Sequence, residues 1–137
     1  MKLKAILSLV VFLFLTSCAG TGTKTIPTVS AGKGGETNLY FVRSSGFIAS
    51  GVLAKIEVNG AEIAKLGVSE YVDYETSNNF RIKVSGSGIG GLGIGVDSTS
   101  GIADGKNYFY IIGVKQGLFS TKFTIQETTE NNFKQID

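Results

Sequence analysis

Apolar and polar residues alternate with a period of two along most of the chain from residue 37 onward. The segment 52–58 shows the pattern clearly, because its even-numbered residues are all apolar and share one face of an extended chain. Alternating segments broken by turn residues predict β-strands. Further strands are expected at 38–43, 61–66, 70–76, 80–86, 107–114 and 119–126. We therefore expect an all-β fold, a small antiparallel β-sandwich of six to eight strands with a short C-terminal helical segment.

The pair Asn59-Gly60 stands between two of these segments, 52–58 and 61–66. Asn-Gly is the strongest short hairpin signal, because both central residues of the favoured turn need positive φ. A two-residue turn here places Val58 opposite Ala61 and Ile56 opposite Ile63.

The segment 107–114 is apolar on both faces, with Tyr108, Tyr110 and Ile112 on one and Phe109 and Ile111 on the other. A strand with two apolar faces needs a cover on each. The opposite sheet is expected to cover one face. The tail 128–136, which has a helical pattern, is expected to cover the other through Phe133 and Ile136. The alternative is that the clustered aromatic residues line a ligand groove.

The segment 86–95 contains six glycines in ten residues. A phosphate-binding glycine loop must open a helix, but the β-branched and glycine-rich residues that follow do not favour one. The alternation slips by one position at Gly90-Gly91, which predicts a hairpin or a bulge with Ile89 opposite Leu92. The alternative is that the bare backbone lets another chain or a flat ligand approach closely.

The amino terminus has the pattern of a secretory signal peptide. A basic start with Lys2 and Lys4 precedes an eleven-residue apolar run, 5–15, which is shorter than the roughly 20 residues that span a bilayer. The next residues complete a Leu15-Thr16-Ser17-Cys18 sequence that resembles a bacterial lipobox. We therefore expect cleavage after residue 17 and lipidation of Cys18, the only cysteine. The alternative is a secreted protein cut near Ala19.

This interpretation divides the chain into three parts: a signal peptide at 1–17, the lipidated cysteine with a flexible tether at 18–36, and the β-sandwich at 37–137. The tether is rich in Gly, Thr and Ser, and about 17 such residues span roughly 20–25 Å. Neither Ala19 nor Gly20 is acidic, so in a Gram-negative host we expect sorting to the outer membrane, with the domain facing the periplasm. The alternative is the surface of a single-membrane bacterium.

Composition restricts the chemistry. The chain has no histidine, and its cysteine is expected to carry lipid, so a Ser-His-Asp relay, thiolate catalysis and His or Cys metal sites are not expected. Without Lys2 and Lys4, 11 of the 13 basic residues remain against 11 acidic ones, and this zero net charge does not indicate nucleic-acid binding. No cofactor is expected.

Two carboxylate pairs remain as candidates for acid–base chemistry. Glu57 and Glu62 are expected to face each other across the Asn-Gly hairpin, and Asp73 and Glu75 share one face of a strand. Close carboxylates can separate their pKa values and act as acid and base. The alternative is that these residues, like the nearby lysines, only keep strand surfaces soluble.

Several short motifs are spread over the domain: Tyr40, Arg43, Phe47, Val58-Asn59-Gly60, Leu66, Tyr71 and Gly105-Lys106-Asn107-Tyr108-Phe109. These motifs resemble those of a family of short bacterial lipoproteins known only as a domain of unknown function. The hairpin is also similar to that of the PEGA-type domain, an envelope β-sandwich. The resemblance implies an envelope β-sandwich and brings no catalytic residues.

Two hypotheses from different classes follow, of which the first is the leading one and the second is the alternative. The first is a lipid-anchored, non-catalytic envelope module, held to the membrane by its lipid, that binds an envelope protein or supports an assembly. The second is a periplasmic domain that binds a small ligand or glycan, or hydrolyses one weakly through its carboxylates. A filled sandwich with separated carboxylates favours the first. An aromatic-lined pocket that ends in the carboxylates favours the second.

Overall fold

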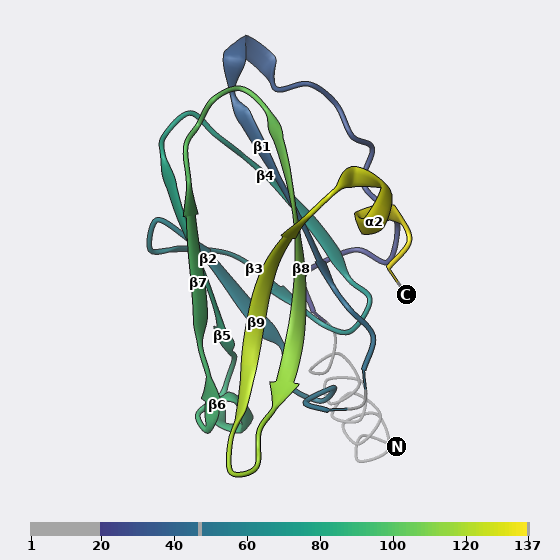
Figure 1. The fold of residues 1–137 in the computed structure, drawn as a ribbon, viewed down its shortest axis with the longest axis vertical. Helices are drawn as coiled ribbons and strands as arrows, with labels where there is room; N and C mark the ends of the chain where they lie inside the picture. The colour runs from purple at the N-terminus through teal and green to yellow at the C-terminus, as the bar shows by residue number, and fades with distance from the viewer. Residues whose placement is uncertain (1–19, 47, 137) are drawn as a thin grey trace, which may run out of the picture.

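Two β-sheets pack face to face in the computed structural model, which describes residues 20–46 and 48–136 (Figure 1). The five-stranded sheet contains, in spatial order, β4 (Tyr71–Thr76), β1 (Thr37–Arg43), β8 (Asn107–Gln116), β9 (Thr121–Thr128) and β6 (Ile94–Gly95). The four-stranded sheet contains β3 (Ala61–Leu66), β2 (Ala54–Val58), β5 (Phe80–Gly86) and β7 (Asp97–Gly101). Short helical segments are η1 (Lys33–Gly35), η2 (Ile89–Gly91) and α2 (Glu130–Lys134). The expected β-sandwich with a C-terminal helical segment is confirmed.

Most neighbouring strands are antiparallel, as expected, but two pairs are parallel. β1 runs parallel to β8, with Leu39 opposite Tyr108, and β6 runs parallel to β9. Parallel neighbours need a long connection, and here residues 44–106 separate β1 from β8 along the chain. All seven residues of β1 are buried, because this strand lies inside its sheet and both of its faces are covered.

The main core fills the space between the sheets. Its largest fully buried apolar side chains include Phe41, Phe123, Ile56 and Ile82, and Phe41 stacks on Tyr110 with ring centroids 5.5 Å apart. These residues come from the inward-facing positions of the alternating strands. The interior of the sandwich is therefore filled by side chains.

A second apolar cluster lies on the outer face of the five-stranded sheet. Phe133 of α2 is fully buried against Tyr40, Tyr71 and Phe109, with ring centroids 5.3–6.3 Å away. Ile136 packs against the same cluster. The prediction that the tail covers the second face of segment 107–114 is confirmed. These aromatic rings are packed together, so they do not line an open groove.

The first described residues lie against the sandwich, which differs from the flexible tether expected over 18–36. The Thr21 amide donates to the Lys65 carbonyl at 2.8 Å, and Thr23 and Tyr71 exchange two backbone hydrogen bonds of 3.0 and 2.8 Å. Farther along, the Ser30 amide donates to the Tyr40 hydroxyl at 3.2 Å. Residues 20–23 are docked because the backbone groups of Thr21 and Thr23 find partners at the edges of β3 and β4, which composition does not reveal.

The glycine-rich segment does not form the predicted hairpin with Ile89 opposite Leu92. Instead, η2 spans Ile89–Gly91 and β6 and β7 follow it. A Cβ atom on Gly86 would lie 2.5 Å from the Cα of Gly91, so the close backbone approach occurs within this chain. The glycines permit a compact turn in which the two backbones touch.

The β2–β3 hairpin has the predicted turn. Asn59 and Gly60 have φ values of 51° and 84°, and Val58 lies opposite Ala61. The expected pairing of Ile56 with Ile63 is wrong, since Ile56 lies opposite Ala64. The register shifts between Ile56 and Glu57, because a β-bulge adds one residue to one strand.

This turn makes a testable prediction. Gly60→Val should lower the free energy of unfolding by about 1–3 kcal/mol, because a β-branched residue is forced to positive φ. Open space surrounds the Cβ position of Gly60, so a steric clash does not contribute. Gly51→Val is the matched control, because Gly51 has equally open surroundings and no positive φ. Urea unfolding of both variants measures the difference, and equal stabilities would contradict the strain argument.

Candidate functional site

The predicted lipidation site, Cys18, lies outside the described residues, but the chain that leaves it can be placed from Gly20 onward. A Cβ atom on Gly20 would lie 1.9 Å from Glu70 Oε1 and 2.6 Å from the amide nitrogen of Gly67. Gly20 is therefore pressed against the turn that connects β3 to β4. The chain that follows the candidate lipidation site joins the sandwich at this end of the molecule, which we call the anchor end.

Arg43, at the end of β1, is buried at the anchor end with 2% of its surface exposed. Its Nη1 donates to the carbonyl oxygens of Val52 and Leu66, the latter at 3.0 Å, and its Nη2 donates to that of Ala49 at 2.6 Å. The guanidinium also lies over the Phe123 ring, 5.3 Å from its centroid. One side chain thus joins the β1–β2 connection to the end of β3.

Burial lowers the pKa of Arg43, and the negative charge of Glu70 opposes this shift. Glu70 is itself buried, and its Oε1 accepts a 2.6 Å hydrogen bond from the Gly67 amide. The Arg43 amide donates to the Glu70 carbonyl, and the Ser69 amide donates to that of Arg43. This network fixes the two connections beside Gly20. The sequence marked Arg43 only as part of a family-like motif and gave no signal that Arg43 is buried.

A small cavity of about 130 Å³ opens beside this network. Its walls come from the β1–β2 connection and from β8, with Ser44, Ile48 and Gly113 among them. Ligand pockets for small molecules are usually about 300–1,000 Å³, so this cavity has room for little more than a few waters.

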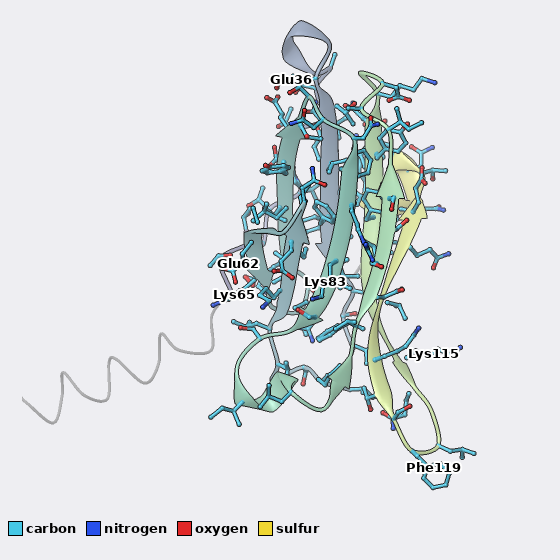
Figure 2. All side chains as sticks on the ribbon, turned by 90° about the vertical axis from the view of Figure 1, so that its left-hand side faces the viewer. Glu36, Glu62, Lys65, Lys83, Lys115 and Phe119 are labelled. Carbon is cyan, nitrogen blue, oxygen red and sulfur yellow. The ribbon has the colours of Figure 1, made fainter. Side chains whose placement is uncertain are left out.

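The structure brings the first predicted carboxylate pair together across two strands. Glu57 and Glu62 lie opposite each other in the β2–β3 register, as expected. Each has a lysine partner, however: Glu57 Oε2 lies 3.9 Å from Lys83 Nζ, and Glu62 Oε1 lies 3.9 Å from Lys65 Nζ. Figure 2 shows Glu62 and Lys65 side by side. This surface arrangement matches charged strand residues that keep the protein soluble.

The second pair, Asp73 and Glu75, lies on β4 in the other sheet. Their cross-strand partners on β1 are Tyr40 and Asn38, respectively. The two carboxylate pairs therefore occupy different sheets and do not converge on one site.

A larger groove of about 570 Å³ lies on the four-stranded sheet, between the β2–β3 hairpin and β7. The side chains that line it are mixed in charge and contain no aromatic ring; they are Glu57, Asn59, Gly60, Arg81, Lys83, Val96 and Ser98. The groove is large enough for a small polar ligand. It lacks the aromatic walls that the ligand-binding hypothesis called for.

A surface hydrogen bond marks the end of the molecule opposite Arg43. The Tyr108 hydroxyl donates to Asp104 Oδ2 at 2.6 Å. This bond lowers the pKa of Asp104 and raises that of Tyr108. The hydrogen bond closes the β7–β8 connection. Because it favours the ionised form of Asp104 and the neutral form of Tyr108, neither group is a good proton donor near neutral pH.

Comparison of the chain with known protein families, curated proteins and solved structures finds no match. The resemblance to short bacterial lipoproteins therefore stays a prediction. Within residues 20–46 and 48–136, no three acidic, histidine or cysteine side chains gather in a way that would hold a metal ion. In the same part of the chain, no helix has the length and apolar character needed to cross a bilayer.

Proposed function

We propose that this protein is a lipid-anchored envelope protein whose β-sandwich binds or supports another envelope component and performs no chemistry. The observation that carries the proposal is the short distance along the chain between Cys18 and the docked residue Gly20. One residue, Ala19, separates them, so a lipid on Cys18 would hold the sandwich directly at the membrane. Such a domain is suited to presenting a fixed surface to a partner.

The packing of the sandwich supports a binding or structural role over catalysis. Its interior is filled by apolar side chains, and the candidate carboxylates are divided between two sheets. The alternative, binding of a small ligand or glycan, has support only from the groove beside Glu57 and Arg81. Carbohydrate and other flat ligands usually need an apolar or aromatic surface beside the polar groups, and this groove offers only Val96.

The anchor is tested by Cys18→Ser. The serine oxygen does not accept the lipid, so we expect the variant to lose all incorporation of labelled palmitate and to accumulate as uncleaved precursor. The matched control is Ser17→Ala, which keeps a small residue before the cysteine and should be labelled and processed normally. A Cys18→Ser protein that is processed normally and remains in the membrane fraction would refute the lipid anchor.

Fractionation of the membranes on a density gradient tests where the protein is located. We propose the outer membrane, with the domain facing the periplasm, because Ala19 and Gly20 carry no acidic retention signal. Recovery of the wild-type protein with inner-membrane markers on a density gradient would contradict this location. Crosslinking in intact cells followed by mass spectrometry would identify the envelope partner.

A further inference from the structure

Four connections meet at the anchor end of the sandwich. β1 and β8 are parallel and both finish there, while β4 begins there because Tyr71 pairs with Val42. β6 lies beside the start of β9, with Ile94 opposite Thr121. The described residues of the connections at this end are therefore 44–46 with 48–53, 67–70, 87–96 and 117–120, and they occupy the lower part of Figure 1.

The tips of two of these connections expose large apolar side chains. Ile89 and Leu92 are 89% and 83% exposed, and Leu118 and Phe119 are 94% and 101% exposed. These are the four most exposed large apolar residues in the described part of the chain. Scattered exposed apolar residues are ordinary, but a group at one end of a domain marks an interaction surface.

Charged residues are almost absent from these connections and lie behind them instead. Across the four connections the only charged residue is Glu70, which is buried. Directly behind the β8–β9 tip, Lys115 and Lys122 are exposed and lie opposite each other in the strand register. Figure 2 shows Phe119 at the extremity of the hairpin, Lys115 behind it and Glu36 at the far end of the molecule.

We propose that the anchor end is a membrane-docking surface, in which Ile89, Leu92, Leu118 and Phe119 insert into the phospholipid leaflet that carries the lipid of Cys18. Lysines behind an apolar tip suit this position, because their stems can lie along apolar surface while their ammonium groups reach anionic head groups. Lys115 and Lys122 then sit at head-group level. The opposite end, with Glu36 and the β7–β8 connection, faces away from the membrane.

The short chain between Cys18 and Gly20 is the reason to expect a bilayer, and not another protein, against the apolar tips. This step rests on the proposed lipid anchor. Two residues of fully extended chain reach roughly 7 Å, so a lipid on Cys18 brings the leaflet close to the anchor end. β8 continues four residues beyond Ile112, which bonds to the start of the β1–β2 connection. The β8–β9 tip therefore projects past the docked network, in the direction of the membrane.

The test uses the intact lipidated protein in vesicles of phosphatidylethanolamine and phosphatidylglycerol. Cys18 is the only cysteine and its sulfur would carry the lipid, so one introduced cysteine is the only free thiol. The variants Leu92→Cys and Phe119→Cys are labelled with the environment-sensitive fluorophore NBD. Ile102→Cys is the matched control, because Ile102 is also an exposed apolar residue but lies in the β7–β8 connection at the opposite end.

We expect blue-shifted NBD emission at positions 92 and 119, loss of that emission when doxyl-labelled lipids are included, and no change at position 102. Emission at 92 and 119 that remains sensitive to aqueous iodide would overturn the docking surface. Protection from iodide without quenching by doxyl lipids would also overturn it, because a second protein or a second copy would then cover the tips.

The intact mass of the same samples tests the anchor separately. Acyl groups on a protein whose tips stay in water would refute only the docking surface. A mass without acyl groups would refute the lipid anchor and, with it, this proposal.

Discussion

Replacing Phe133 with alanine should lower the free energy of unfolding by about 3–5 kcal/mol, the usual cost of deleting a large buried aromatic side chain. Phe133 is fully buried, and its ring contacts Tyr40, Tyr71 and Phe109. The five-residue α2 is too short to be stable by itself, so without this ring it should detach and expose the outer face of the five-stranded sheet.

Urea unfolding followed by circular dichroism measures the loss. Phe119→Ala makes the same substitution at a fully exposed position and should change stability by no more than about 0.5 kcal/mol. A Phe133→Ala protein as stable as this control would mean that α2 does not cover the sheet in solution.

The strands were predictable because their signal is local. Alternation places apolar side chains on one face of a strand whatever its neighbours are, so segments such as 52–58 and 80–86 can be recognised without knowing the fold. The two-faced apolar character of 107–114 even indicated the need for Phe133 on the outer face. The turn at Asn59-Gly60 was equally clear, since few residue pairs accept two positive φ values.

Other features depend on distant partners and leave no local pattern. The bonds from Thr21 to Lys65 and from Thr23 to Tyr71 join backbone atoms, so the composition of 20–36 gives no sign of them. β7 has the sequence DSTSG and was not predicted, because its place in the sheet comes from backbone pairing with β5. The β-bulge at Ile56 and Glu57 likewise changes the register without a residue type that announces it.

The two candidate sites differ in the same respect, because one has a local sequence signal and the other has none. Cys18 could be proposed from a contiguous motif, because lipidation signals are short and linear. The apolar tips at Leu92 and Phe119 could not be proposed from sequence, since an apolar residue in a glycine-rich turn is as easily buried as exposed. Only the topology shows that these tips lie at the end where Gly20 enters the sandwich.

Arg43→Met should cost about 3–5 kcal/mol of unfolding free energy, comparable to the removal of one partner from a buried polar network. Methionine has a similar length and no donors, so it would leave the carbonyl groups of Ala49, Val52 and Leu66 without the bonds that Arg43 now supplies. It would also remove the positive charge that lies near buried Glu70. Thermal and urea unfolding would both report the loss.

The other arginine provides the control. Arg81 is exposed on β5, so Arg81→Met should change the free energy of unfolding by no more than about 0.5 kcal/mol. Equal stabilities of the two methionine variants would contradict the structural role assigned to Arg43.

Arg43→Lys separates charge from geometry. Lysine keeps the positive charge but cannot present a planar fork to carbonyl groups on two connections at once, so its stability should fall between those of the wild type and Arg43→Met. A lysine variant as stable as the wild type would mean that the charge facing Glu70 is sufficient. A lysine variant as unstable as the methionine variant would mean that the hydrogen bonds to the β1–β2 connection and to the end of β3 carry the whole effect.

Because these bonds fix the connections beside Gly20, their loss should loosen the end of the sandwich that the lipid would hold at the membrane.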